Sequence, residues 1–239
     1  ALYPNLGADF QVVKKGGTTH KEDMVIECAG HPIHNISAKH KKKLGSGSFD
    51  WVNTSAATQE EKNLSVFRND LAHIKATRTG RDVEETRELV KTRAHEALRT
   101  LDSDAIKRIL QKHVCDKNQD MHIIITETST GDIHSFCFKD HPLNTLVQRG
   151  YEARLEFLNP DPSQTSAKVV FWDPANPETT FDWGIRMRLL TNNGITALLG
   201  KNNKGKNNTS SAVIKIQQDN IIPLLSTMGT NVKTIKGNQ

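Results

Sequence analysis

The feature that most constrains the fold is a long block of helical periodicity that interrupts a series of short apolar runs. From residue 58 to about 115, apolar residues recur three or four positions apart, as at Leu64, Phe67, Leu71 and Ile74. This spacing is typical of helices that bury one face. The runs on either side are short and bounded by Gly, Pro and Asn, which is typical of β-strands. Strands, then helices, then strands predict an α+β or mixed α/β fold and not a regular βαβ alternation.

The predicted strands fall on both sides of this block. They are Phe10–Val13, Met24–Cys28, Pro32–Lys39, Ile123–Thr126, Ile133–Phe138, Tyr151–Leu158, Ala167–Trp172, Ile185–Leu190 and Ala212–Gln217. Short helices are expected at Leu143–Arg149 and Ile221–Met228, and Asp102 or Ser103 is expected to cap the third helix of the block. The pattern predicts a core with a helical insertion over residues 1–150 and a β-rich lobe over residues 151–239, with a single domain as the alternative.

Composition limits the class of protein. The chain has 239 residues, 36% of them hydrophobic, which is enough for one large domain or for a core with an appended lobe. No apolar run approaches the roughly 20 residues of a membrane span, and the first residues do not resemble a signal peptide. The three cysteines are widely spaced and odd in number, which indicates reduced thiols. We therefore expect a cytoplasmic protein without a membrane partner, either a monomer or a homodimer.

The distribution of charge points to a polyanionic partner. The net charge is only +5, but residues 186–239 contain eight Lys and Arg against one acid, Asp219. A second basic cluster runs from Lys39 to Lys43. Each contact between such a side chain and a phosphate releases condensed counterions, so clusters this one-sided suit a polyanion. Composition alone supports a solvated basic surface equally well.

Specific side chains are expected to contact a nucleic acid. Residues 201–210 form a basic, Asn-rich loop, and Arg186 and Arg188 are two apart on a strand, so they share a face. Lys and Asn are residues that bind phosphates and base edges. The expected contacts are Lys41, Lys42, Lys43, Arg186, Arg188, Lys201, Asn202, Asn203, Lys204 and Lys206. The alternative for residues 201–210 is a disordered solvent loop that orders only if a partner is present.

One pair of residues carries the chemistry. Asp23 opens an apolar strand and Lys39 closes the next one. If these strands pair antiparallel about Gly30, Asp23 lies beside Ser37 to Lys39. A carboxylate in this position can bind Mg²⁺, which polarises a phosphoryl oxygen and lowers the pKa of its bound water. A neighbouring lysine can stabilise the charge that develops on the phosphate.

Residues 16–43 resemble the PD-(D/E)XK restriction-endonuclease-like superfamily, and within it the type II restriction enzymes. The likeness rests on the Gly16-Gly17 turn, on Lys21-Glu22-Asp23, and on Lys39-His40 followed by further lysines. The resemblance implies a central mixed sheet flanked by helices. It also implies Mg²⁺-dependent hydrolysis of double-stranded DNA at a short defined sequence. Asp23, Ser37 and Lys39 would be the catalytic residues, and Asp23 and the carbonyl of Ala38 would bind the metal.

The sequence departs from the superfamily pattern at two points. Ser37 stands where the second acid is usual, so the second metal-binding carboxylate must come from elsewhere. Glu27, which shares side-chain parity with Asp23, is the first substitute, and Glu60 or Glu61 is the next. The helix that usually precedes the first core strand has little room before Asp23, so it is expected to be short or to precede Ala1.

Three other hypotheses remain open. In a non-catalytic nucleic-acid-binding protein, Asp23 and Lys39 would be an ordinary surface pair. A structure-specific or repair nuclease would use the same chemistry without sequence preference. Finally, the short spacings of Cys28, His31, His34 and His40 could hold Zn²⁺, although no second pair of ligands with metal-binding spacing supports such a site.

Overall fold

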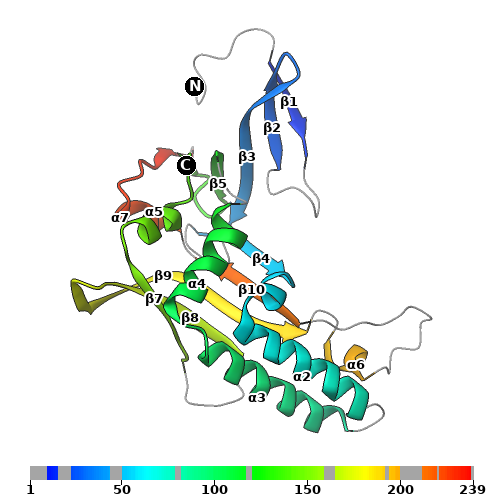
Figure 1. Ribbon diagram of the computed structural model, residues 1–239. Coiled ribbons are helices and arrows are strands. Elements are labelled where there is room, and N and C mark those ends of the chain that lie inside the picture. Colours follow the sequence, from blue (N-terminus) through cyan, green and yellow to red (C-terminus); the bar gives the residue numbers. More distant parts are fainter. Residues whose placement is uncertain are drawn as a thin grey trace.

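Two β-sheets and a layer of helices make up the described part of the chain (Figure 1). The computed structural model describes residues 10–15, 23–43, 50–78, 82–116, 120–158, 165–191, 194–199, 212–219 and 221–237. The expected mixed α/β class with a mixed sheet is confirmed.

The first sheet, sheet A, contains six strands in the order β1-β2-β3-β5-β6-β11. Their bounds are β1 Phe10–Lys14, β2 Met24–Cys28, β3 His31–Lys41, β5 Met121–Glu127, β6 Ile133–Phe138 and β11 Lys233–Ile235. Strands β3 and β5 run parallel, and every other neighbouring pair in this sheet is antiparallel. Sheet A is therefore a mixed sheet.

The β2–β3 hairpin sets the register on which the predicted site depends. Ala29 and Gly30 both have positive φ, 50° and 79°, as a two-residue type I′ turn requires. Glycine adopts this conformation without steric cost, whereas Ala29 is strained there. A β-bulge between Ile26 and Glu27 then shifts the pairing by one residue, so that Met24 pairs with Ile36 and the residue before Met24 lies level with the residue after Ile36.

The second sheet, sheet B, is antiparallel throughout, in the order β4-β10-β9-β8-β7. Its strands are β4 Asp50–Thr54, β7 Glu152–Glu156, β8 Ser166–Asp173, β9 Asn176–Thr191 and β10 Ala212–Gln218. The helices are α1 Ala57–Glu60, α2 Lys62–Arg78, α3 Val83–Arg99, α4 Ser103–Leu110, α5 Pro142–Gln148, α6 Gly194–Leu198 and α7 Ile222–Thr227, with a π-helical turn, η1, at Gln111–Cys115.

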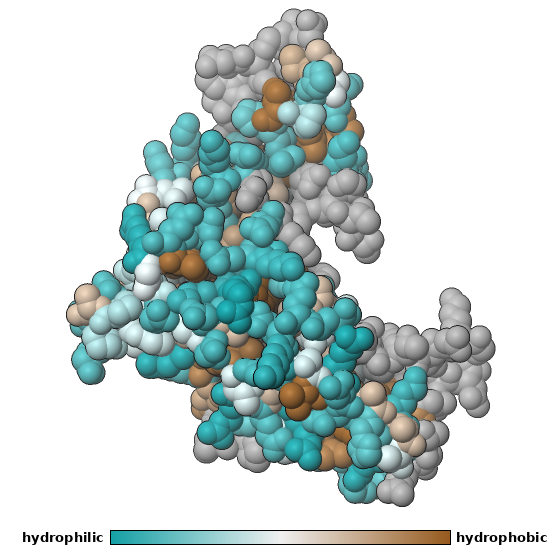
Figure 2. Space-filling model, in the orientation of Figure 1, coloured by the Kyte–Doolittle hydropathy of each residue, from teal (hydrophilic) through white to brown (hydrophobic). Residues whose placement is uncertain are grey.

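The long helices bury their apolar faces against sheet B. Phe67 of α2, Leu98 of α3, Ile106 of α4 and Met187 of β9 are fully buried in one core. Figure 2 shows that the outer face of this part of the molecule is mostly hydrophilic, as expected of helices with one apolar side. The sequence resemblance implied helices flanking the mixed sheet, but these helices lie on the antiparallel sheet.

Sheet A has a smaller core of its own. Ile123 and Ile125 of β5 and Phe136 of β6 pack with Ile221 and Leu225, from the start and middle of the α7 segment. Strand parity places these side chains on one face of the sheet. The face that receives α7 is also the face on which Asp23, Ser37 and Lys39 lie, because Ser37 pairs with Ile123 and Lys39 with Ile125.

The two sheets divide the chain differently from the expected boundary at residue 150. Strand β4 and helices α1 to α4 belong with sheet B, and β11 returns to the edge of sheet A. The pairing of Val52 with Ile216 and of Thr234 with His134 ties distant segments together. Strands β4 and β11 and helix α6 were not expected from the sequence, and β9 begins at Asn176, well before the expected strand Ile185–Leu190.

Candidate functional site

The structure brings Asp23 beside Ser37 and Ala38. Asp23 Oδ2 accepts a hydrogen bond from the Ala38 N–H at 2.7 Å and another from the Ser37 hydroxyl at 3.2 Å. The Asp23 N–H donates to Ile36 O at 2.8 Å, which continues the hairpin ladder by one residue. Ser37 is buried, with 3% of its surface exposed. The carboxylate is therefore oriented by two donors from β3.

Ala38 and Lys39 complete this group. In a β-strand, the N–H and C=O of one residue point toward the same neighbouring strand. Because the Ala38 N–H donates to Asp23, the Ala38 carbonyl also faces the β2 side of β3, just beyond the first residue of β2. Lys39 is half-buried and stands on the same face as Asp23 and Ser37, next to Ile125 of β5. No described residue forms a hydrogen bond or an ion pair with Lys39 Nζ.

The three candidates for a second carboxylate have basic partners. Glu27 lies at the closed end of the hairpin, opposite Pro32, and contacts Lys15 at 3.5 Å. Asp23 lies at the open end, so Glu27 does not join it. Glu61 pairs with Arg108 at 2.9 Å.

Glu60 belongs to a separate charged pocket. Its carboxylate lies 2.9 Å from Lys112 Nζ, and the Lys112 hydrogen bond lowers the pKa of Glu60. Glu60, Glu61, Arg108 and Lys112 line a pocket of about 500 Å³ between α1 and η1. These acids therefore neutralise the basic residues of α4 and η1.

The histidines and cysteine near the hairpin do not form a metal site in the described part of the chain. Cys28 and His31 are paired at the closed end of the hairpin, whereas His40 lies near the other end of β3. Among the described residues, one group of three His, Cys, Asp or Glu side chains has ligand atoms close enough to hold a metal ion, and it contains none of these residues.

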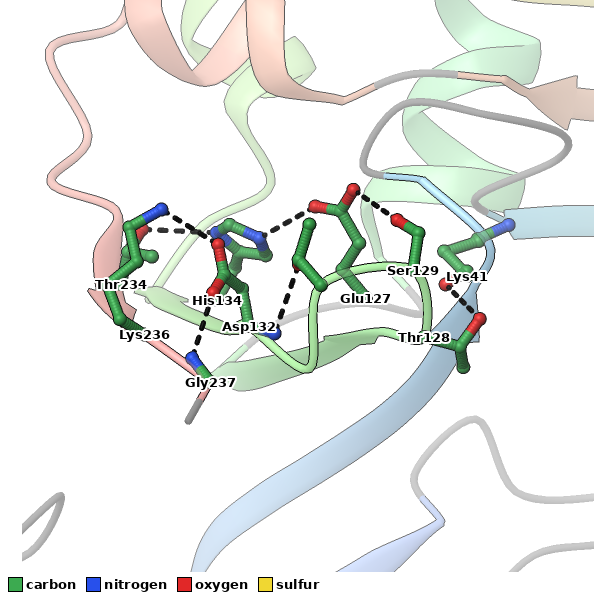
Figure 3. Close-up of polar contacts among 10 residues, drawn as sticks. Lys41, Glu127, Thr128, Ser129, Asp132, His134, Thr234, Lys236 and Gly237 are labelled. Carbon is green, nitrogen blue, oxygen red and sulfur yellow. Dashed lines mark hydrogen bonds and ion pairs between the residues drawn. The ribbon is translucent and has the colours of Figure 1, made fainter. Parts of the chain in front are cut away.

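That group lies at the turn between β5 and β6 (Figure 3). It consists of Glu127 at the end of β5, Asp132 in the turn and His134 on β6, with ligand atoms all within 4.8 Å of one another. Asp132 and His134 are each 6% exposed. This cluster, the Glu127–Asp132–His134 triad, could hold a metal ion. Sequence reasoning missed it, although an acid and a histidine flanking a recognised hairpin turn were a usable signal.

The C-terminal segment docks on this triad. Lys236 Nζ lies 2.8 Å from Asp132 Oδ2, and the Gly237 N–H donates to Asp132 Oδ1 at 2.9 Å. The Lys236 hydrogen bond is the main reason that the pKa of Asp132 is lowered, and the same hydrogen bond raises the pKa of Lys236. From the same segment, Thr234 Oγ1 lies 3.1 Å from His134 Nδ1 (Figure 3).

The triad and Asp23 lie toward the same end of sheet A. Among the described strands, β3 and β5 are the only parallel neighbours, and their C-terminal ends carry Lys41 opposite Glu127. Asp23 is level with Ser37, four residues before Lys41 along β3, which corresponds to roughly 13 Å. One ion therefore cannot be shared by Asp23 and Glu127.

The expected DNA contacts lie on both sheets. Arg186 and Arg188 are exposed on the outer face of sheet B, where Arg186 pairs with Asp219 at 3.0 Å and Arg188 contacts Thr165 Oγ1 at 3.3 Å. Lys41, Lys42 and Lys43 follow Lys39 at the end of β3, with Lys42 and Lys43 exposed. The remaining predicted contacts lie outside the described residues; they are Lys201, Asn202, Asn203, Lys204 and Lys206.

The comparisons with known proteins identify no relative of this chain. None of the described helices combines the length and apolar character that crossing a membrane requires. Comparison of the chain with protein-family models, with curated proteins and with solved structures found no match.

Proposed function

We propose that this protein is an Mg²⁺-dependent endonuclease that hydrolyses phosphodiester bonds in double-stranded DNA at a short defined sequence. The observation that carries the proposal is the position of the Asp23 carboxylate. It accepts hydrogen bonds from the Ser37 hydroxyl and the Ala38 N–H of β3, and Lys39 is the next residue along that strand. The restriction to a defined sequence rests on the resemblance of residues 16–43 to type II restriction enzymes.

The donor set suits Mg²⁺. Both described hydrogen bonds to the Asp23 carboxylate go to Oδ2, so Oδ1 is the oxygen that would hold the cation, together with the carbonyl of Ala38. Mg²⁺ takes oxygen ligands and retains several waters, so one carboxylate and one carbonyl are a sufficient protein contribution. When bound, Mg²⁺ would polarise a phosphoryl oxygen and lower the pKa of its bound water.

The neighbouring side chains have separate tasks. Lys39 Nζ has no ion pair with a described residue and would stabilise the negative charge that develops on the phosphate. The Ser37 hydroxyl and the Ala38 N–H hold the Asp23 carboxylate in one orientation, which is the positioning that hydrolysis requires. Lys42 and Lys43, exposed after β3, would contact the DNA backbone close to the reacting phosphate.

A second candidate function is favoured by a different observation. Glu27 and Glu61 have basic partners, as does Glu60, so Asp23 receives no second carboxylate from the three acids that the sequence suggested. One carboxylate holds Mg²⁺ less tightly than two would. A nucleic-acid-binding protein without catalytic activity, in which Asp23 only orders the hairpin, accounts for this arrangement.

Digestion of a supercoiled plasmid of known sequence distinguishes these functions. With Mg²⁺ we expect a set of discrete fragments, and with EDTA no cleavage. A smear would indicate a nuclease without sequence preference. Retarded plasmid with no cleavage at any Mg²⁺ concentration would favour the second candidate. Lys39→Ala should slow cleavage by roughly a hundredfold or more, whereas Lys91→Ala, an exposed position on α3, should leave the rate unchanged.

A further inference from the structure

We propose that the Glu127–Asp132–His134 triad binds a divalent transition metal of the Zn²⁺ or Co²⁺ class, and that the ammonium group of Lys236 is an internal cation which the metal displaces. This inference is independent of the proposed nuclease function, because the triad and Asp23 are too far apart to share an ion. It concerns the turn between β5 and β6 and the segment 233–237 that docks there (Figure 3).

The donor set selects the class of metal. Two carboxylates and one imidazole give a mixed oxygen and nitrogen site, and imidazole favours Zn²⁺ and its neighbours over Mg²⁺ or Ca²⁺. His134 Nε2 and Glu127 Oε2 are 3.4 Å apart. This separation is close to the roughly 3.4 Å edge of a tetrahedron whose bonds are about 2.1 Å long, the usual Zn²⁺ geometry. Three protein ligands leave a fourth position for water.

His134 is supported in the way that a ligating histidine requires. Its Nδ1 lies 3.1 Å from Thr234 Oγ1, and a hydroxyl both donates and accepts hydrogen bonds. The imidazole can therefore carry its proton on Nδ1, where Thr234 accepts it, and present the Nε2 lone pair toward Glu127. A hydrogen-bond partner on the second ring nitrogen is typical of metal-binding histidines.

Asp132 is held independently of Lys236. Its Oδ1 accepts the Gly237 N–H at 2.9 Å, and Oδ2 is the oxygen that Lys236 contacts. Gly237 packs so closely on the turn that a Cβ there would clash with Thr130 O and lie 2.7 Å from the Gly131 carbonyl carbon. The backbone hydrogen bond therefore keeps the carboxylate oriented when the Lys236 side chain leaves.

Lys236 is suited to be displaced. Its side chain is 80% exposed, whereas the Asp132 side chain is 9% exposed. The ammonium can therefore move into solvent without leaving a buried charge, while Asp132 requires a cation beside it in either state. Metal binding at the triad and the Lys236 ion pair then compete for Asp132 Oδ2.

Titration of the full chain with Co²⁺ and Zn²⁺ tests the inference. Calorimetry should give a stoichiometry that includes one metal ion per chain at the triad, which the variants below identify. Bound Co²⁺ should show the visible absorption of a low-symmetry site. His134→Gln should weaken this site by more than roughly tenfold, because it removes a ligand. Lys236→Gln should strengthen it by roughly threefold, because it removes the competing cation. Lys233→Gln, at an exposed position of β11 three residues before Lys236, is the matched control and should leave the affinity unchanged.

The outcomes are distinct. Absence of binding, affinity unaffected by His134→Gln, or Lys236→Gln weakening or not changing the affinity would each overturn the inference. If His134→Gln fails to fold, the metal affinity of Lys236→Gln, a substitution at an exposed position, still tests the inference. Asp23→Asn should retain the triad's affinity for Co²⁺, so failure of the nuclease proposal and failure of this inference are separable.

Discussion

Sheets A and B differ in the kinds of side chain that their covered faces carry. Sheet B is covered by α2, α3 and α4, and its inward side chains form a large apolar core. Sheet A has a small apolar cluster around β5 and β6, and beyond it the strand ends carry Asp23, Lys39 and the Glu127–Asp132–His134 triad.

The difference indicates a division of labour. Apolar burial at roughly 25 cal/mol per Å² makes the region around sheet B the main source of folding stability. Sheet A instead places ionisable groups at the C-terminal ends of its parallel strands, the edge at which open α/β sheets bind ligands. Perturbing sheet B should therefore change stability, and perturbing these groups in sheet A should change chemistry.

The largest expected effect is a contrast in thiol reactivity. Burial, with a smaller contribution from Asp116, raises the pKa of Cys115 to about 12, whereas Cys137 on β6 is exposed. A pulse of iodoacetamide followed by peptide mass spectrometry should label Cys137 at least roughly a thousandfold faster than Cys115, because Cys115 must wait for the core to open. Similar labelling rates for both thiols in the folded protein would show that η1 is not tightly packed on the helical layer. As a control, the two thiols should react at similar rates in the protein unfolded in guanidinium.

A pair of neighbouring substitutions on α2 measures the stability of the sheet B region. Phe67 is fully buried, whereas Val66 is 56% exposed. Phe67→Ala should lower the free energy of unfolding by about 3–5 kcal/mol, and Val66→Ala should lower it by less than about 1 kcal/mol. Urea unfolding followed by circular dichroism gives both values. Equal effects would contradict the assignment of the main core to this region.

Removing basic residues tests which sheet grips DNA. Arg186→Ala with Arg188→Ala should reduce the slope of log K against log salt by up to roughly 2, about one for each phosphate that an arginine no longer neutralises. Fluorescence anisotropy in EDTA over a salt series measures this slope. Arg87→Ala, an exposed arginine of α3 that pairs with Glu84, is the control. An unchanged slope in the double variant would leave the other predicted lysines, Lys41 to Lys43 and Lys201, Lys204 and Lys206, as the residues that bind the DNA backbone.

The smallest expected effect is a pH dependence confined to the C-terminal segment. The Lys236 and Gly237 hydrogen bonds hold the pKa of Asp132 below its ordinary value of 3.8. These hydrogen bonds therefore stabilise the docked segment fully above that pH, and the stabilisation disappears as the pH falls through the lowered pKa. The protection factor of the Gly237 amide, corrected for intrinsic exchange, should fall below about pH 3.8 and remain flat from pH 5 to 7. Persistence of full protection in strong acid would argue against an ionised Asp132.

Local patterns made much of sheet A predictable. Met24–Cys28 and Ile133–Phe138 were predicted with their observed bounds, and Asp23 lies beside Ser37 as expected, although an unexpected β-bulge between Ile26 and Glu27 contributes to this register. Asp102 caps α4 by accepting the Ala105 N–H at 2.7 Å. These features depend on residues that are close in sequence, where alternation, turn chemistry and capping operate.

The remaining features depend on long-range contacts. Strand β4 exists because Val52 pairs with Ile216, and β11 because Thr234 pairs with His134. Both β4 and β11 contain residues that favour strands, but runs of five and three residues are too short to show a clear alternating pattern. The triad acquires Lys236 in the same way, from a segment far along the chain. Pairing with segments that are distant in the sequence therefore forms β4, β11 and the Lys236 contact, which local propensity does not predict.

The central claim, that Asp23 binds the catalytic cation, is tested most directly by Asp23→Asn assayed for cleavage and for binding on the same DNA. The substitution removes a charged metal ligand while keeping the acceptor oxygen for Ala38 N–H, so the hairpin should persist. We expect cleavage with Mg²⁺ to fall by more than roughly a hundredfold, with DNA affinity in EDTA changed by less than roughly twofold. Cleavage near the wild-type rate, or a loss of binding as large as the loss of cleavage, would contradict the assignment of Asp23 to the active site.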